Sequence, residues 1–233
     1  MIQVIKSYIN SFSHLLYPHN CEGCGTDILN DDDFLCAKCF YELPKTGFID
    51  VAYNPVEKIF YGRLRLEQAA AGYYFTKDGL LQHLIGQVKY KRHRDLGIYL
   101  GKLIGYQLKK TNRFTDVELL VPLPLNDRKE AKRGYNQATL ICEGIAQVWQ
   151  KNIVSDAVAR TVFTQSQTNK TRVARWQNME GVFAITNAMQ LQGKHILLVD
   201  DITTTGATLE ACGSEILQVA NTKLSILTVA FTI

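Results

Sequence analysis

Residues 196–208 have the sequence ILLVDDITTTGAT, and this stretch decides the fold class of the chain. The apolar run 196–199 is short, as in a buried central strand of a parallel sheet. Two adjacent carboxylates, Asp200 and Asp201, follow the run, and apolar residues recur with helical period from Leu209 onwards. The order strand, loop and helix predicts an α/β domain with polar groups at the carboxyl end of a strand, where open α/β sheets bind ligands.

The loop between this strand and helix has the composition of an anion site. Its residues are small or hydroxylated: Thr203, Thr204, Thr205, Gly206, Ala207 and Thr208. Because no bulky side chain covers the backbone N–H groups and the helix dipole adds positive potential, the loop suits a phosphate dianion. Asp200 and Asp201 would repel a phosphate, but they can accept hydrogen bonds from sugar hydroxyls or hold a hydrated Mg²⁺. The combination indicates a phosphorylated ribose; the alternative is a capped helix behind two solvated acids.

Four of the six cysteines form two Cys-x-x-Cys pairs separated by eleven residues. These candidate ligands are Cys21, Cys24, Cys36 and Cys39. Such pairs favour a tetrahedral zinc site closed by four thiolates, which has a structural role because no position is left for water. Two disulfides are the alternative, and a cytosolic location and the short spacing disfavour them. The other two cysteines, Cys142 and Cys212, occupy apolar helical positions and are expected in the core.

The length of 233 residues allows one medium-sized domain and a small appendage. We expect residues 1–45 to hold an amphipathic helix at about 1–17 and the cysteine unit, and residues 46–233 to form the α/β domain. No apolar stretch approaches the ~18 residues that span a bilayer, and the first residues lack the apolar core of a signal peptide. A cytoplasmic protein without membrane insertion is expected; a helix on a membrane surface is the alternative for residues 1–17.

The formal net charge of +4 is distributed unevenly along the chain. Residues 1–50 have a balance of −4, whereas residues 89–133 have twelve Lys or Arg against five Asp or Glu. A basic middle segment is consistent with a polyphosphate or nucleic-acid ligand. Within it, the run KYKRHR at 89–94 can contact a phosphate backbone while Tyr90 stacks on a base, or it can be a solvated connection between helices.

Further segments complete the α/β pattern. Strands are predicted at 67–76, 116–123, 156–163, 181–185 and 223–233, and helices at 79–89, 95–110 and after Gln137. Pro44 and Pro55 bracket a predicted linker. Residues 164–172 are polar and without apolar period, so they are predicted to be a lid over a ligand.

A cation-rich loop is predicted after the strand at 116–123. It contains Arg128 and Arg133, and Gly134 follows them. Arginine binds phosphate through two parallel hydrogen bonds, and glycine allows the backbone to approach a ligand closely. A solvated basic turn is the alternative.

The segment 199–208 resembles the PRPP-binding signature of type I phosphoribosyltransferases, and the chain from about Cys21 to its end resembles the ComF family. The motifs that carry the second resemblance are the four cysteines, VPLP at 121–124 with Arg128, RGYNQ at 133–137, Gln167-Thr168 with Arg175 and Asn178, and the segment 199–208. One departure from the family pattern is Asn169-Lys170, where a leucine is typical.

The resemblance implies a type I phosphoribosyltransferase fold, a Rossmann-like parallel sheet with flanking helices, and a small N-terminal zinc unit. It implies PRPP or a related phosphoribosyl ligand, with the 5-phosphate in the loop 203–208 and the ribose on the catalytic pair Asp200 and Asp201. Arg128 and Arg133, together with Mg²⁺, would hold the diphosphate. The family is associated with natural competence, which implies a role in DNA uptake with single-stranded DNA and a protein of the uptake machinery as partners.

Catalysis is left open, because nothing in the sequence identifies a pocket for an acceptor base. An active phosphoribosyltransferase of nucleotide metabolism or salvage is one alternative. A non-catalytic module that binds nucleic acid or protein is the other.

Overall fold

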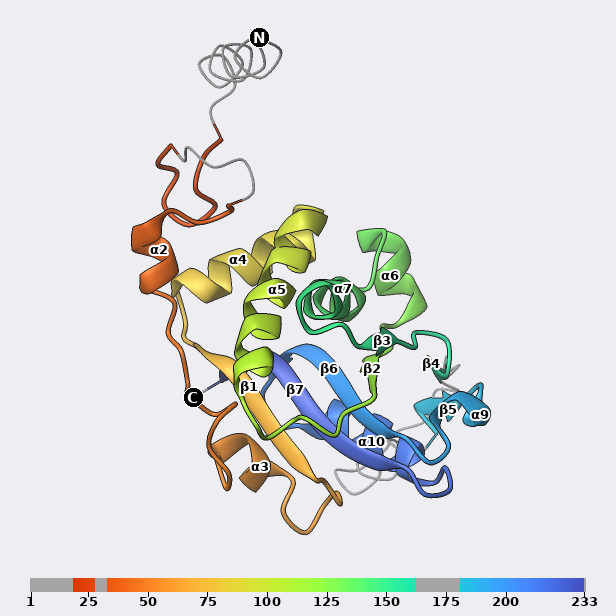
Figure 1. Ribbon diagram of the computed structural model, residues 1–233. Coiled ribbons are helices and arrows are strands. Elements are labelled where there is room, and N and C mark those ends of the chain that lie inside the picture. Colours follow the sequence, from red (N-terminus) through yellow and green to blue (C-terminus); the bar gives the residue numbers. More distant parts are fainter. Residues whose placement is uncertain (1–18, 28–32, 162–180, 233) are drawn as a thin grey trace, which may run out of the picture.

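The computed structural model describes residues 19–27, 33–161 and 181–232, and a parallel sheet of five strands lies at its centre (Figure 1). In the order β1-β7-β6-β2-β3, the strands are β1 (Gln68–Phe75), β7 (Lys223–Thr232), β6 (His195–Thr203), β2 (Leu119–Pro122) and β3 (Asn152–Ile153). Residues 196–199 of β6 have no exposed surface, as expected of a strand that is covered on both faces. The strand predicted there is confirmed, and it continues through the acidic pair to Thr203.

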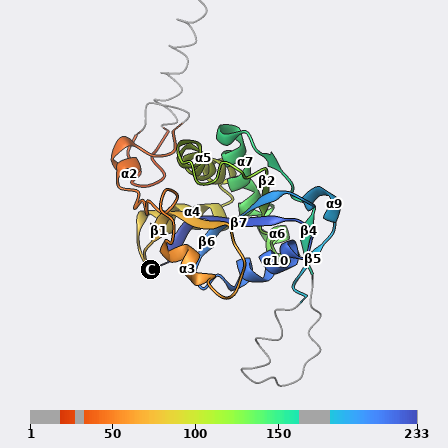
Figure 2. The ribbon, with the colours of Figure 1, turned by 60° about the horizontal axis from the view of Figure 1, so that its bottom comes forward.

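Helices cover both faces of the sheet. α5 (Arg94–Lys110) and α7 (Gln137–Trp149) lie on one face, and α10 (Ala207–Leu217) lies on the other (Figure 2). α4 (Leu80–Tyr90) packs against α5 and β1. The helices predicted at 79–89 and 95–110 are confirmed to within one residue at each end, because their apolar period is regular.

α5 and α7 approach each other unusually closely. A Cβ atom added to Gly101 of α5 would lie 2.2 Å from the carbonyl oxygen of Ile141, and one added to Gly144 of α7 would lie 2.0 Å from that of Ile98. Only glycine fits at such a crossing. The pair fixes α7, and with it the segment that precedes α7, against the sheet.

The strands predicted at 156–163 and 181–185 form a separate structure. β4 (Val158–Arg160) and β5 (Phe183–Ile185) pair with each other in a two-stranded antiparallel sheet, and the short helix α9 (Ala188–Leu191) follows. The predicted lid at 164–172 lies outside the described residues, as does the helix predicted at 1–17.

The cation-rich segment after β2 is a helix, and the prediction of a loop there was wrong. α6 (Asp127–Arg133) begins after Asn126, whose side chain accepts a hydrogen bond from the backbone N–H of Arg128 at 3.2 Å. It ends at Gly134, which has a φ of 82° and donates its N–H to the carbonyl of Glu130. Both signals, an asparagine N-cap and a left-handed glycine C-cap, are present in the sequence.

The segment between Pro44 and Pro55 is packed against the sheet, so it is more than a connecting linker. Phe48 and Ile49 are buried, and the guanidinium of Arg113 donates to the carbonyl oxygen of Val51 at 2.7 Å. The segment leads into α3 (Pro55–Ile59), which begins after the cap residue Asn54. Among the described residues, no helix combines the length and the apolar character needed to cross a membrane.

Candidate functional site

The loop 203–208, called the phosphate loop below, connects β6 to α10. Gly206 has a φ of 73° at the N-cap of α10, and no side chain caps the first turn. The first N–H groups of α10 therefore face a small polar hollow of about 60 Å³. Its lining is made by Asp200 and residues 202–209. About 10–15 Å³ of such space is enough for one water molecule, so the hollow can admit a small anion.

Packing from a distant part of the chain shapes this loop. A Cβ atom on Gly206 would lie 2.8 Å from both Ile59 and Phe60, which shows that the end of α3 lies directly against the turn. The guanidinium of Arg63 donates to the carbonyl of Thr205 at 3.1 Å and forms an ion pair with Glu210 of α10. Sequence analysis missed Arg63, because no local pattern connects it to a loop 142 residues away.

The two aspartates at the end of β6 have different surroundings. Successive side chains of a strand point to opposite faces, yet the two carboxyl groups stay close enough for Asp201 to affect the acidity of Asp200. Asp200 borders the hollow. Asp201 is only 5% exposed, and its Oδ2 lies 2.7 Å from the Nζ of Lys89, at the end of α4. Lys89 was noted in the sequence as part of a basic run and not as the partner of Asp201.

The environment of Asp200 changes its acidity. Burial and the neighbouring Asp201 carboxylate raise the pKa of Asp200 to about 8, against the opposing effects of the Asp201 N–H and the Lys89 ammonium. At neutral pH the carboxyl group therefore keeps its proton. A neutral Asp200 does not repel an anion in the hollow, and it can donate a hydrogen bond as well as accept one.

Arg128 and Arg133, the predicted diphosphate ligands, lie on α6 and do not line the hollow. Arg128 is exposed. The guanidinium of Arg133 donates to Oε1 of Gln137 at 2.5 Å and lies 5.9 Å from the ring centroid of Tyr90, next to Lys89 in the chain. The structure thus brings Arg133 to the same helix end that supplies the partner of Asp201.

The RGYNQ segment at 133–137 joins four elements at one corner. The hydroxyl of Tyr135 donates to the carbonyl of Val88 in α4. The amide of Asn136 donates to the carbonyl of Leu123 after β2 at 2.9 Å, and its oxygen caps α7 by accepting from Ala138. This motif therefore has a structural role that fixes α4, α6 and α7 around the end of β2.

Two basic segments that are distant in sequence meet at this corner. One is the run 89–94, which covers the end of α4 and the start of α5, and the other is α6; we call their joint surface the basic surface. The guanidinium of Arg92 lies 3.4 Å from the carbonyl of Lys132, and that of Arg94 lies 5.3 Å from the ring centroid of Tyr135. Tyr90, in the same run, is 78% exposed. Cations around an exposed aromatic ring suit a single-stranded nucleic acid.

The four predicted ligands Cys21, Cys24, Cys36 and Cys39 form a compact cluster. Their sulfur atoms all lie within 4.8 Å of one another, and the Sγ atoms of Cys24 and Cys36 are 3.7 Å apart. With Zn–S bonds near 2.3 Å, the sulfurs of a tetrahedral site lie about 3.8 Å apart. The cluster can therefore hold a metal such as zinc. All six cysteines are free thiols, which excludes the two disulfides in this structure.

Local backbone groups prepare the cluster for a cation. Burial raises the pKa of Cys21, but backbone N–H groups, including those of Cys36 and Gly23, lower it to about 6 overall. Their distances to the Cys21 sulfur are 3.2 and 3.4 Å. Gly23 itself is needed for space: a Cβ atom there would lie 2.8 Å from the Cys39 sulfur and from Leu80.

The cysteine unit is docked on the α/β domain. The carbonyl of Glu22 accepts from the Gln87 amide at 3.0 Å, and its carboxylate lies 2.9 Å from Nε2 of His93. The ring of Phe34 packs between those of His93 and Tyr99. Gln87 and His93 flank the end of α4, so the unit contacts the helix that carries Lys89.

Comparison with curated proteins finds a DNA utilization protein and two competence proteins among the relatives of the chain. The chain is 31% identical to the DNA utilization protein YhgH of Escherichia coli K12 over 132 residues, 55% of this chain and 57% of that protein. It is 29% identical to competence protein F of Haemophilus influenzae, over 43% of this chain and 44% of that protein. Competence protein ComFC of Bacillus subtilis is 33% identical, over 39% of this chain and 35% of that protein. The matches thus span little more than half the length of these relatives at most.

Among solved structures, the chain is similar to a glutamine PRPP amidotransferase from Bacillus subtilis, with a TM-score of 0.39, 12% identity, and coverage of 56% of this chain and 25% of that one. It is also similar to a hypoxanthine phosphoribosyltransferase from Staphylococcus aureus, with a TM-score of 0.35, 16% identity, and coverage of 57% of this chain and 61% of that one. No family model matches the chain. The parallel sheet with flanking helices and the cysteine cluster agree with the predicted type I phosphoribosyltransferase fold with a four-cysteine unit. Over part of its length, the chain is therefore a homologue of YhgH, competence protein F and ComFC.

Proposed function

We propose that the chain binds PRPP or a closely related phosphoribosyl ligand at the carboxyl end of β6, and that this binding serves DNA uptake in natural transformation. The observation that carries the proposal is the hollow at the uncapped N-terminus of α10, whose N–H groups surround a space on the scale of one phosphate. The names of the relatives, a DNA utilization protein and two competence proteins, support the biological role.

In this proposal the phosphate loop binds the 5-phosphate of the ligand. Backbone N–H groups at the start of α10 and the threonine hydroxyls donate hydrogen bonds to the phosphate oxygens. The loop is held in place by Arg63 and α3, so little ordering is left for the binding step. Asp200, beside the same hollow, accepts from a ribose hydroxyl.

Asp201 and Lys89 complete the ribose side of the site. Because the Lys89 ammonium occupies one carboxylate oxygen of Asp201, a ribose hydroxyl binds the other oxygen or displaces the lysine. A displaced Lys89 stays on the same side as Arg133 and joins it in binding the diphosphate. Mg²⁺ prefers carboxylate oxygens, so its binding at the acidic pair would release the proton that Asp200 keeps at neutral pH, and a bound Mg²⁺ would neutralise part of the diphosphate charge.

The same arrangement can support transfer of the phosphoribosyl group. Departure of diphosphate leaves positive charge at C1 of the ribose, so catalysis would rest on charge stabilisation and positioning by the residues above. No side chain has to act as a covalent nucleophile. Transfer also requires an acceptor for the phosphoribosyl group. Binding of PRPP and release of diphosphate are therefore two separate properties, and each needs its own test.

A specific observation favours single-stranded DNA as a second ligand. The basic surface joins the run 89–94 to α6 around the exposed Tyr90, and it adjoins the Lys89–Asp201 pair. A strand bound there would be held by lysines and arginines on its phosphates and by stacking on the tyrosine. Its affinity should fall as salt rises, because bound cations are released from the strand.

Calorimetric titration of PRPP with Mg²⁺ into the zinc-loaded protein tests the first property. Binding is expected for the wild type and absent for Asp201→Asn, with an unchanged circular dichroism spectrum. Asp116→Asn is the matched control, since Asp116 is exposed and outside the site. Undiminished binding by Asp201→Asn would contradict the assignment of the acidic pair.

A diphosphate-release assay then tests the second property. Release in the presence of a purine, a pyrimidine or single-stranded DNA would make the chain an enzyme and identify its acceptor class. Binding without release under all these conditions would leave the binding role and exclude transfer to those acceptors.

A further inference from the structure

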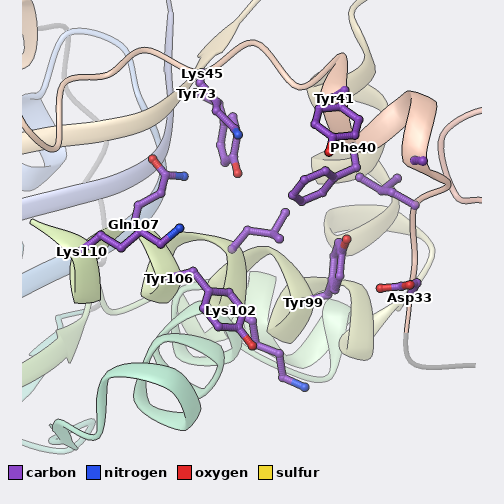
Figure 3. Close-up of a pocket in the computed structure, with 13 residues that line it drawn as sticks. Asp33, Phe40, Tyr41, Lys45, Tyr73, Tyr99, Lys102, Tyr106, Gln107 and Lys110 are labelled. Carbon is purple, nitrogen blue, oxygen red and sulfur yellow. The ribbon is translucent and has the colours of Figure 1, made fainter. Parts of the chain in front are cut away.

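A second concave site lies between the cysteine unit, β1 and α5, away from the phosphate loop (Figure 3). Its volume is about 830 Å³, and none of its lining residues belongs to the hollow at α10. The lining comes from α2 (Ala37–Tyr41), the segment after it, β1 and α5. The functions proposed above make no use of it.

Aromatic rings form the walls of this site. Phe40 and Tyr41 of α2 lie on one side, and Tyr99 and Tyr106 of α5 lie across from them (Figure 3). Tyr41 is 80% exposed and Tyr106 is 56% exposed. Exposed ring faces on two sides of an opening suit a flat, apolar ligand group that stacks on one of them.

Positive charge surrounds the rings. Lys45, Lys102 and Lys110 line the site together with one carboxylate, that of Asp33, and none of the three lysines forms an ion pair with a described residue. The ammonium of Lys45 lies 5.5 Å from the centre of the Phe40 ring. Three cations at one opening favour a ligand with negative charge.

A buried polar group lines the site. The side-chain amide nitrogen of Gln107 makes no hydrogen bond of full geometry with a described residue, and the Gln107 side chain interacts with the hydroxyl of Tyr73. Buried donors are nearly always satisfied in native structures. Gln107 lines the site beside Tyr73, so an acceptor on a ligand can reach this amide (Figure 3).

We propose that this site binds a nucleotide unit, with the base stacked on Tyr106, a base oxygen accepting from Gln107, and the phosphate held by the lysines. A neutral aromatic ligand would leave the three ammonium groups without use, and a bare phosphate would leave the rings exposed. A nucleotide has both parts. It can be free or a member of a single strand, and these two sources share the same recognition chemistry.

Titration calorimetry with two probes, thymidine 5′-monophosphate and a deoxythymidylate hexamer, tests this inference. Binding of each probe is measured at several salt concentrations. Tyr106→Ala should weaken binding of at least one probe about 5-fold or more, as expected for a lost stacking contact. Lys102→Ala should weaken it and reduce the salt slope of hexamer binding by about 0.7, the value for one phosphate contact. Lys109→Ala is the matched control, because Lys109 is exposed on the same helix and does not line the site.

Saturating PRPP should leave the binding of either probe unchanged, which distinguishes this site from the phosphate loop. Binding of the monophosphate alone assigns a free nucleotide, and binding of the hexamer alone assigns a strand if Tyr106→Ala weakens it; both results support the inference. Hexamer binding that Tyr106→Ala leaves unchanged belongs to the basic surface and would overturn the inference. Binding of neither probe would overturn it. So would equal losses in Lys109→Ala and Lys102→Ala, no loss in Tyr106→Ala, or displacement of the probe by PRPP.

Discussion

The cysteine unit and the phosphate loop are both short sequence motifs, but they depend on the rest of the molecule to different degrees. The four cysteine sulfurs lie within 4.8 Å of one another, so one metal ion would crosslink the unit by itself. The phosphate loop is shaped by α3 and by Arg63, which belong to a part of the chain about 140 residues earlier. A metal motif can carry its own crosslink, whereas an anion-binding loop depends on tertiary packing.

Loss of the metal should have the largest effect on stability and little effect on the phosphate loop. We expect Cys39→Ser to lose bound zinc and to lower the free energy of unfolding by about 4 kcal/mol or more, because metal binding contributes directly to folding. PRPP binding should survive at temperatures where the variant is folded. Metal analysis, thermal unfolding and calorimetry measure these three quantities.

Cys212→Ala is the control, since Cys212 is buried in the core and outside the cluster. It should keep its zinc. If Cys39→Ser kept one zinc per chain, the four-cysteine assignment would be wrong.

Gly206→Ala should damage the phosphate loop and leave the zinc in place. The new Cβ would have to adopt a φ of 73° and would lie 2.8 Å from Ile59 and Phe60. The two effects together should cost about 3 kcal/mol, and PRPP binding should be lost. Chemical denaturation and calorimetry measure the outcome.

Gly193→Ala separates the strain of a left-handed backbone from the clash with a neighbouring segment. Gly193 has a φ of 71°, but a Cβ atom there would meet nothing within 4 Å. It should cost only about 1 kcal/mol, the strain of the left-handed backbone. Equal losses for the two variants would show that α3 does not shape the loop.

The raised pKa of Asp200 predicts a pH dependence specific to the loop. The unfolded chain releases this proton near pH 3.8, whereas the folded chain keeps it up to about pH 8. Within that window the folded state binds more protons, so the free energy of unfolding should fall as pH rises, by about 1 kcal/mol between pH 6 and 7. Asp200→Asn should remove this slope in denaturation curves measured without Mg²⁺. A slope identical to that of the wild type would contradict the raised pKa.

Removal of Arg63 should have the smallest effect on stability. Its ion pair with Glu210 is partly exposed, so we expect Arg63→Ala to cost about 1 kcal/mol or less. PRPP affinity should nevertheless fall, because the Thr205 carbonyl loses the donor that orients the loop. Arg65→Ala, a neighbouring exposed arginine, is the control for calorimetry. Equal affinities of the two variants would exclude a positioning role for Arg63.

The same contrast explains what could be predicted from the sequence. The order of strands and helices and the cysteine cluster follow from local periodicity and spacing. The partners of the site residues come from distant segments: Lys89 for Asp201, Arg63 for Thr205 and Tyr90 for Arg133. Those pairs depend on how α3, α4 and α6 pack around the sheet, which one sequence does not specify.

The wrongly predicted loop after β2 is a different case. Asn126 and Gly134 are ordinary signals for the start and end of a helix, but the dense charge between them is also typical of an exposed loop. Because α6 has no buried residue, it lacks the apolar period by which the other helices were recognised.

The most direct test of the phosphoribosyl site is a crystal structure of the zinc-loaded protein with PRPP and Mg²⁺. We predict the 5-phosphate in the hollow at the start of α10, in contact with backbone N–H groups of residues 205–208, and the ribose beside Asp200 and Asp201. An ordered PRPP molecule elsewhere, with the hollow holding only water, would contradict the account.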